Sequence, residues 1–311
     1  MTALFSALIA VFGLILLGQV LQRTAFTNDA FWHIAERLIY FLALPALLVS
    51  NLSAAPLEAL DLGRMAVALV IPVTLVTILL LAWQARYDTF TGPAFTSVFQ
   101  GGIRLNTYIG LATAGALFGS DGLAMAAVSL AVLIPLVNIF SVLALLRHTG
   151  SASKTGANLL IMQILRNPLV LACLLGIGLN MLDVGLFPPL HTLLDALGQA
   201  ALPLGLMAVG AGLQIARLGQ HARPALLSSG IKLILLPMLS VPVIVALGLT
   251  PVAAIGVVLF AALPTSASSY ILARQLGGDA QLMASILSLQ TLLSAVTLPV
   301  ILWLTLHLPT A

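Results

Sequence analysis

The chain has very little charge. Only 7% of its 311 residues are charged, whereas a soluble domain carries about 25%. Hydrophobic residues make up 61% of the chain, and the mean hydropathy is +1.16. This composition excludes a soluble globular domain and predicts an integral membrane protein in a lipid bilayer. The 12 basic residues are scattered rather than clustered, so we expect no nucleic-acid partner.

Groups that carry covalent or metal chemistry are also scarce. The single cysteine, Cys173, excludes an intrachain disulfide and lies in an apolar run, which indicates a buried thiol. The five histidines lie near the ends of apolar runs or between them: His33, His148, His191, His221 and His307. We recognise no HExxH motif, no glycine-rich phosphate loop and no intramembrane Ser–His pair. The sequence therefore predicts no enzyme, no metal site and no cofactor.

Long apolar runs, by contrast, fill the chain. At about 20 apolar residues per crossing, the sequence predicts ten membrane spans joined by short connections. They cover residues 4–22, 33–52, 62–84, 94–118, 122–146, 159–182, 190–213, 225–248, 251–276 and 281–307. The predicted fold class is an all-α integral membrane protein with ten transmembrane helices.

The basic residues in the connections and near the span ends favour one side of the membrane. One of them, Arg64, lies in an even-numbered connection, and nine lie in odd-numbered connections. These nine are Arg23, Arg37, Arg86, Arg147, Lys154, Arg166, Arg217, Arg223 and Arg274. By the positive-inside rule the odd-numbered connections are cytoplasmic, so both termini are predicted to face outward. The expected location is the plasma membrane, which in a bacterium is the inner membrane.

The chain reads as two similar halves of five spans, residues 1–146 and 159–311, with a short cytoplasmic linker at 147–158. At a constant offset of 158 residues, the Ala-Leu-Pro at 43–45 matches the Ala-Leu-Pro at 201–203. Pro93 matches Pro251, and a GxDxxxMA pattern at 119–126 recurs at 277–284. Because five is an odd number, the second half must be inverted in the membrane. Inverted repeats of this kind are a recurrent plan of secondary transporters.

Spans 4 and 9 are interrupted at corresponding points. Span 4 contains Gly101, Gly102 and Asn106, and the position 158 residues after Asn106 is Pro264, in span 9. Proline removes a backbone donor and breaks a helix. A bilayer tolerates such breaks only where they are buried in protein or line a wet cavity. A matched pair of broken helices, predicted here to cross, indicates a substrate site near the bilayer midplane.

Charges within the spans are few and positive. Arg104 lies near the middle of span 4, and Lys232 lies about eight residues into span 8, whereas no acidic residue lies at comparable depth. Cations without a buried anion favour a negatively charged ligand, and the planar arginine fork suits a carboxylate. The alternatives are that Arg104 caps carbonyls freed by the break and that Lys232 extends to the cytoplasmic interface.

Further polar groups surround the two interruptions. Asn106 and the hydroxyls that follow Pro264 are candidate binding groups; these hydroxyls belong to Thr265, Ser266, Ser268 and Ser269. Each has a structural alternative, because the amide could satisfy backbone groups at the break and the hydroxyls could bond within their helix. Other polar residues in the spans are expected mainly to hold helices together: Asn138, Ser288, Gln290, Thr291 and Ser294.

Four stretches carry a resemblance to a known family: RLNTYIGLATAGALFGSDG at 104–122, LRNPLVLACLLGIGL at 165–179, ALPLGLMAVGAGL at 201–213 and ALPTSASSYILARQLGGD at 262–279. Through them the whole chain resembles the auxin efflux carrier family, which includes plant auxin carriers and bacterial malonate and malate permeases. The resemblance implies a fold like that of the bile acid–sodium symporters. Spans 1, 2, 6 and 7 would form a scaffold, spans 3–5 and 8–10 a moving transport domain, and two copies a homodimer.

Two features depart from the family pattern. The linker is far shorter than the cytosolic loop of many plant auxin carriers. Gly110-Leu111-Ala112 stands where many relatives have a proline after the asparagine of the first crossover. The break in span 4 is therefore expected to come from Gly101, Gly102 and Asn106.

The resemblance implies a secondary transporter that moves a small organic anion, such as malonate, malate or an auxin-like acid, by an elevator-type mechanism. Arg104 would then hold the carboxylate, with Asn106 and the hydroxyls at 265–269 completing the site. Lys232 would balance charge in the empty carrier, in place of a coupling cation. Two alternatives stay open: a sodium-coupled symporter of the bile acid type, and a membrane sensor that binds its ligand without moving it.

Overall fold

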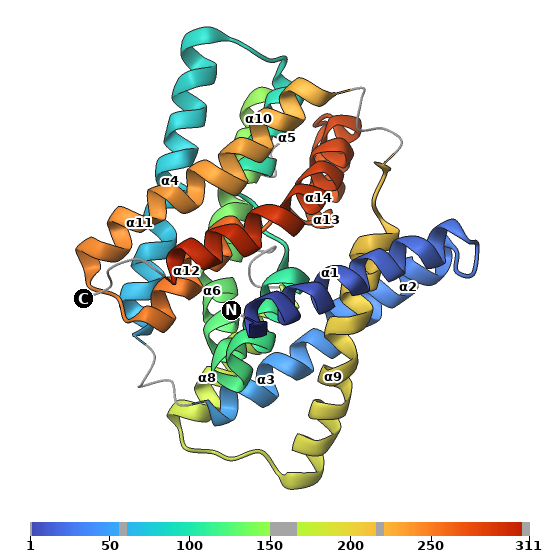
Figure 1. The fold of residues 1–311 in the computed structure, drawn as a ribbon, viewed down its shortest axis with the longest axis vertical. Coiled ribbons are helices and arrows are strands. Elements are labelled where there is room, and N and C mark those ends of the chain that lie inside the picture. Colours follow the sequence, from blue (N-terminus) through green and yellow to red (C-terminus); the bar gives the residue numbers. More distant parts are fainter. Residues whose placement is uncertain (1, 56–60, 150–166, 216–220, 307–311) are drawn as a thin grey trace. The chain divides into compact units, whose positions relative to one another are not determined.

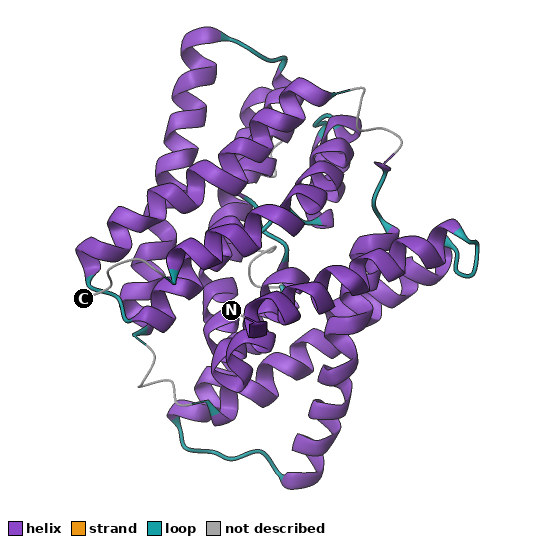
Figure 2. Cartoon of the chain, viewed as in Figure 1, coloured by secondary structure: helices purple, strands orange, loops and turns teal. Residues whose placement is uncertain are grey.

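The structure is a computed structural model that describes residues 2–55, 61–149, 167–215 and 221–306. All regular elements within these ranges are helices (Figure 2), so the prediction of an all-α membrane protein is confirmed. Seven helices in the described ranges are long and apolar enough to cross a bilayer, or eight if the bent pair at 251–276 forms one span. The ten-span inverted repeat stays a prediction. The linker from residue 150 onward, and span 159–182 before residue 167, lie outside the described residues.

The chain divides into two compact units, each of which is described by itself (Figure 1). Unit 1 contains five α-helices, one π-helical turn and residues 107–131 of helix α6. The elements are α1 (Thr2–Arg23), α2 (Asp29–Leu38), the turn η1 (Ile39–Ala43), α3 (Leu44–Ala54), α8 (Pro168–Met181) and α9 (Pro188–Ala211). Helix α1 packs along α9, and α3 packs against both α8 and α9.

Glycines allow the helices of unit 1 to approach closely. A Cβ atom on Gly18 of α1 would overlap the carbonyl oxygen of Met207, and one on Gly210 of α9 would overlap the carbonyl oxygen of Ile15. The backbones of α1 and α9 are therefore in contact at Gly18 and Gly210, which have no side chains. Small residues commonly allow membrane helices to pack this closely.

On α8, the thiol of the fully buried Cys173 donates a hydrogen bond to the carbonyl oxygen of Ala127, 3.4 Å away.

Unit 2 contains the rest of the described chain, including residues 132–148 of α6. Its elements are α4 (Leu62–Tyr87), which enters the unit at Gly63, α5 (Gly92–Ile103), α10 (Ala222–Gly230), the π-helical turn η4 (Ile231–Leu235), α11 (Leu236–Leu247), α12 (Pro251–Ala262), α13 (Ala267–Leu276) and α14 (Ala280–Thr305). Helix α14 packs against α5, α10, α12 and α13. A buried apolar cluster joins four of these helices through Val98 of α5, Ala225 of α10, Ala273 of α13 and Met283 of α14.

Helix α6 (Thr107–His148) is two helical segments that meet at a kink. The kink is at Gly119, whose φ of 59° and ψ of −135° are not helical. Glycine adopts a positive φ without the steric penalty that a Cβ atom brings. The predicted boundary between span 4, which ends at 118, and span 5, which begins at 122, falls at this residue.

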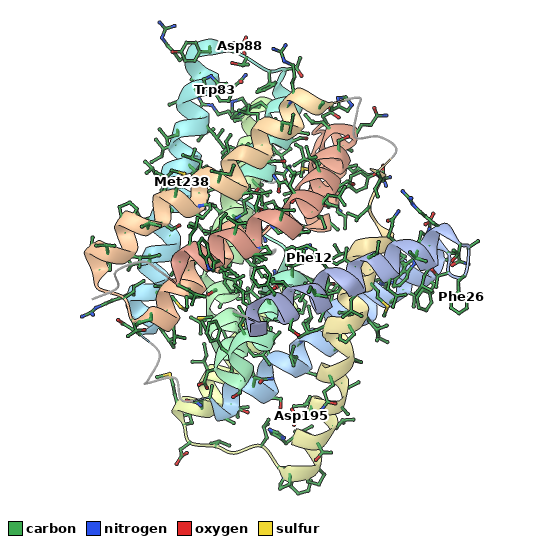
Figure 3. The ribbon with its side chains drawn as sticks, viewed as in Figure 1. Phe12, Phe26, Trp83, Asp88, Asp195 and Met238 are labelled. Carbon is green, nitrogen blue, oxygen red and sulfur yellow. The ribbon has the colours of Figure 1, made fainter. Side chains whose placement is uncertain are left out.

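Large apolar side chains cover the outer faces of both units. Among those more than half exposed are Ile9 and Leu16 on α1, Ile78 on α4, Met238 on α11 and Val296 on α14. Figure 3 draws these side chains and labels Met238, together with Phe26 in the connection after α1. A soluble monomer rarely exposes so much contiguous apolar surface, whereas helices that face lipid require it.

Candidate functional site

The first interruption follows α5. This helix ends at Ile103, and residues 104–106 are non-helical before α6 begins at Thr107. Arg104 has extended backbone angles, φ −77° and ψ 161°, while its N–H still donates to the carbonyl oxygen of Gln100. Asn106 lies within the break and is 2% exposed.

Gly101 and Gly102 lie in the last turn of α5, where they allow close packing. A Cβ atom on Gly101 would overlap the hydroxyl oxygen of Ser228 on α10, and one on Gly102 would lie 3.2 Å from side-chain carbons of Ile231 and Leu80. Both glycines have helical geometry, since α5 continues to Ile103. Their small size therefore brings the end of α5 against its neighbours, next to the point where the helix stops.

The second interruption separates α12 from α13. Helix α12 ends at Ala262, residues 263–266 are non-helical, and α13 begins at Ala267 with a bend of 45° between the two helices. Leu263 is extended, with φ −64° and ψ 141°. The next residue, Pro264, has no N–H, so it ends the hydrogen-bond ladder of α12.

One side chain bonds to both interruptions. Gln290 of α14 donates from Nε2 to the carbonyl oxygen of Gly101, at 3.0 Å, and accepts from the N–H of Thr265 at its Oε1, at 2.8 Å. These are backbone groups that a continuous helix would have satisfied itself. The sequence predicts only that Gln290 holds helices together, and the structure shows which backbone groups it satisfies. A sequence signal exists, because a carboxamide in an apolar helix requires buried polar partners.

Arg104 also connects the two interruptions. Its Nη2 donates to the hydroxyl oxygen of Ser268 in the first turn of α13, at 2.9 Å, and its Nη1 donates to Oδ1 of Asn138 on α6, at 2.7 Å. The arginine is 6% exposed. Both of these partners are neutral, so neither cancels the positive charge of the guanidinium, and together they hold its plane in place.

The hydroxyls after Pro264 form two pairs. Thr265 and Ser269 are fully buried and bond to each other at 2.9 Å, whereas Ser266 and Ser268 bond to each other at 2.6 Å, and Ser268 is exposed. The first pair has its hydrogen bonds within the core of unit 2. The second pair is accessible, and through Ser268 it is linked to Arg104.

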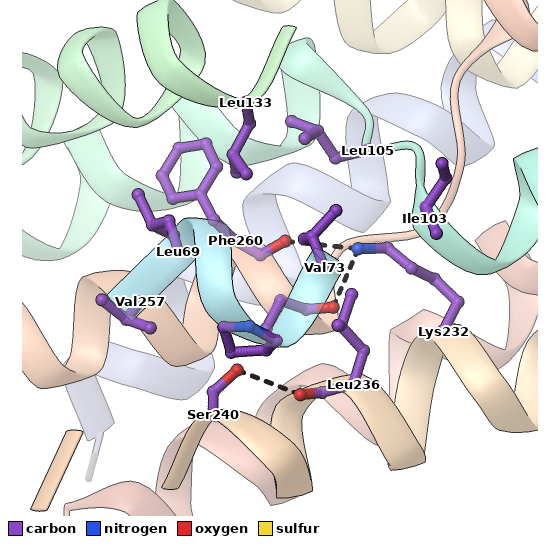
Figure 4. A pocket seen from close by; sticks show the side chains of 12 residues that line it. Leu69, Val73, Ile103, Leu105, Leu133, Lys232, Leu236, Ser240, Val257 and Phe260 are labelled. Atoms are coloured by element: carbon purple, nitrogen blue, oxygen red, sulfur yellow. Dashed lines mark hydrogen bonds between the residues drawn. The ribbon is translucent and has the colours of Figure 1, made fainter. Parts of the chain in front are cut away.

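Lys232 is 1% exposed and extends into the interior of unit 2 rather than to its surface. Its ammonium group donates to the carbonyl oxygens of Ala261, at 2.9 Å, and Phe260, at 3.4 Å (Figure 4). Both carbonyls belong to the last turn of α12. The lysine thus contacts the second interruption from the side of α12, and Arg104 contacts it from the side of α13.

Unit 1 contains a Ser–His–Asp cluster that the sequence did not reveal. The hydroxyl of Ser50 on α3 lies 3.3 Å from Nε2 of His191 on α9 and also donates a hydrogen bond to Asp195, which Figure 3 labels. Nδ1 of His191 lies 3.0 Å from the same carboxylate. From the sequence we recognise no Ser–His pair inside the membrane, and the structure places this pair near the end of α3 and the start of α9. The histidine and the aspartate are one turn apart on a helix, but the serine is 141 positions away from His191.

The arrangement of this cluster differs from that of a hydrolase triad. In such a triad the serine proton is held by the histidine, and the aspartate contacts only the far side of the imidazole ring. Here Ser50 donates directly to Asp195 and is 2% exposed, so the cluster joins α3 to α9. Within the described ranges no group of three or more His, Cys, Asp or Glu side chains could hold a metal ion.

Comparison with known proteins indicates a role in membrane transport. A family model described as "Membrane transport protein" matches residues 154–302, which include α12, the second interruption and most of α14. Over these residues the chain is similar to this membrane transport protein family. An uncharacterized transporter of Methanothermobacter thermautotrophicus is 26% identical over 294 residues, which cover 94% of this chain and 95% of that relative. The resemblance to auxin efflux carriers is thereby confirmed. The match and the apolar helices support a transporter that is embedded in the membrane.

Proposed function

We propose that this membrane transport protein is a secondary transporter for a small organic anion, a carboxylate such as malonate, malate or an auxin-like acid. One observation carries the proposal: the buried guanidinium of Arg104 is held by two neutral side chains at the break between α12 and α13. A carboxylate can accept two parallel hydrogen bonds from such a group. The N-terminus of α13, which begins one residue before Ser268, adds the positive end of a helix dipole.

The remaining groups are assigned by their accessibility. Ser266 and Ser268 would donate to the bound carboxylate, because both reach solvent in the structure. Thr265 and Ser269 would support them from the core, and Asn106 would complete the site from the first break. The substrate would cross as unit 2 moves in the manner of an elevator, in a homodimer whose termini face outward across the plasma membrane. The confirmed family resemblance supports this mechanism, in which broken helices carry the substrate site.

Counterflow in proteoliposomes tests the proposal. Vesicles containing the purified protein are loaded with unlabelled carboxylates, and the entry of labelled malonate is followed. We expect rapid entry for the wild type and a loss of at least about tenfold for Arg104→Ala below half-saturation, since a hydrogen bond to a charged group is worth about 1.5–3 kcal/mol.

Matched variants make this test specific. Arg86→Ala removes an exposed arginine at the end of α4 and should transport like the wild type. Arg104→Lys keeps the charge but loses the fork, so it should retain part of the activity. Arg104→Ala with wild-type counterflow would overturn the assignment of this residue. Absence of counterflow with every mono- and dicarboxylate, in folded protein, would favour the sensor.

A further inference from the structure

The end of α12 leaves two carbonyl groups without their helical partners. In a continuous α-helix a carbonyl oxygen accepts from the N–H four residues later. For Phe260 that residue is Pro264, which has no N–H. For Ala261 it is Thr265, whose N–H donates to Gln290 instead. Phe260 and Ala261 are both buried, so their oxygens need another donor.

The ammonium group of Lys232 is that donor, and it carries a full positive charge. Lys232 lies in the π-helical turn η4, where the regular ladder of the helix is disturbed because Pro237 has no N–H for the carbonyl of Leu233. The ammonium reaches both oxygens at the C-terminal end of α12, which is the negative end of the helix dipole. Within the described chain no ion pair includes Lys232. Carbonyl dipoles, rather than a carboxylate, therefore stabilise its charge.

The same oxygen chemistry binds alkali cations. In transporters, carbonyls of unwound segments and the C-terminal ends of half-helices coordinate sodium. Lys232 lines a small cavity with room for about one water molecule. The other lining residues, most of which Figure 4 labels, are apolar except for Ser240. The ammonium thus contacts oxygen atoms of the kind that bind sodium, beside a cavity with room for about one water molecule.

We propose that Lys232 is a built-in replacement for a coupling sodium ion. Its ammonium holds the end of α12 in the way that a bound sodium would, so anion transport by this protein requires no sodium. The inference deepens the proposed function and rests on it for the statement about transport. The statement about the cation site rests only on the contacts of Lys232.

Two kinds of substitution separate this role from simple filling of space. Lys232→Ser removes the ammonium and most of the stem, and leaves two carbonyl oxygens, a hydroxyl and a space large enough for sodium. Lys232→Met leaves the carbonyls unsatisfied but fills the space with an apolar chain of similar length. Lys232→Arg keeps a positive charge. Of these three variants, a sodium response is therefore expected only of Lys232→Ser.

Thermal denaturation in detergent, with sodium chloride against choline chloride at equal ionic strength, tests the site without any substrate. For Lys232→Ser we expect the apparent Tm to rise by about 2–4 °C with sodium, as for a ligand present well above its Kd. The wild type and the arginine and methionine variants should not respond. A sodium-dependent rise in the wild type, or no rise in a folded Lys232→Ser protein, would overturn the inference. If Lys232→Ser does not fold, Lys232→Ala replaces it, since it also removes the ammonium and leaves space beside the two carbonyl oxygens.

Counterflow supplies the second readout. The wild type should exchange labelled carboxylate equally well in sodium and in choline, whereas Lys232→Ser should be several-fold faster in sodium. Wild-type exchange that requires sodium would overturn the inference and leave the anion carrier intact. A sodium-dependent Tm in Lys232→Ser, combined with no counterflow in the wild type, would instead support the cation site and overturn the proposed substrate class.

Discussion

Gln290 donates a hydrogen bond from Nε2 to the carbonyl oxygen of Gly101, 3.0 Å away and 189 positions earlier in the chain. The other atom of the same carboxamide accepts the N–H of Thr265. The end of α5 and the break after α12 are thus joined through one rigid planar group in the core of unit 2. Displacing either break would cost a buried hydrogen bond.

Gln290→Leu should destabilise the protein strongly. It leaves a buried N–H and a buried carbonyl without partners, and each costs about 1–3 kcal/mol. We expect a large fall in the apparent Tm in detergent. Gln281→Leu, which changes an exposed glutamine of the same helix, is the control and should leave the Tm nearly unchanged. Equal Tm values for the two variants would contradict the bridging role.

Ser268→Ala should impair substrate binding more than folding. The residue is exposed, and its hydroxyl accepts from Arg104, so its removal frees the guanidinium to change orientation. We expect the half-saturating substrate concentration in counterflow to rise about fivefold, equivalent to about 1 kcal/mol, at an unchanged Tm.

Ser269→Ala should instead impair folding more than substrate binding. This residue is fully buried and bonds to Thr265, so its loss should lower the Tm and leave half-saturation nearly unchanged. If the two serine variants behaved alike in both measurements, the division of the hydroxyls into an accessible and a supporting pair would be wrong.

Gly210→Ala should disrupt unit 1. The added Cβ would overlap the carbonyl oxygen of Ile15, which is backbone and cannot move without separating α1 from α9. We expect a clear loss of folded protein in size-exclusion chromatography and a lower Tm. Gly13→Ala on α1 is the control, since nothing lies within 4 Å of its Cβ position. That variant should be neutral or slightly stabilising, because alanine favours the helix.

Ser50 should not react as a hydrolase nucleophile. Its hydroxyl proton is donated to Asp195, and the residue is almost fully buried. A fluorophosphonate probe is therefore expected to label wild-type protein no more than Ser50→Ala, as measured by in-gel fluorescence. Labelling that disappears in Ser50→Ala would show a reactive serine and reopen an enzymatic role.

Local chemistry was visible in the sequence, and long-range pairing was not. Pro264 in an apolar run marks a helix end wherever it occurs, and Arg104 stands out because charge inside a span is costly. The partners at the two breaks are ordinary polar residues elsewhere in the chain: Gln290 bonds to Gly101 and Thr265. Asn138 and Ser268 bond to Arg104. The sequence showed that these residues needed partners, but the choice of partner depends on which helix faces are packed together.

The same distinction applies to Lys232 and to the cluster in unit 1. The sequence shows that Pro264, four residues after Phe260, offers no N–H to the carbonyl of Phe260. Nothing in the sequence indicates that η4 faces the end of α12. Ser50 and His191 come from helices α3 and α9, whose contact follows from glycine packing at Gly198 against Leu47. A single residue such as Pro264 can mark a helix end in the sequence. The contacts of Lys232 and of the Ser–His–Asp cluster depend on tertiary packing, which the sequence does not show.

The buried position of Cys173 has a practical consequence for topology. The chain contains no other cysteine, and this thiol is fully buried and bonded to Ala127, so an impermeant maleimide should leave the wild-type protein unlabelled. Cysteines introduced singly at the exposed positions Thr89 and Val184 can then be labelled in whole cells without first removing the native one. If the odd-numbered connections are cytoplasmic, Val184→Cys reacts from outside, and Thr89→Cys reacts only after the cells are opened.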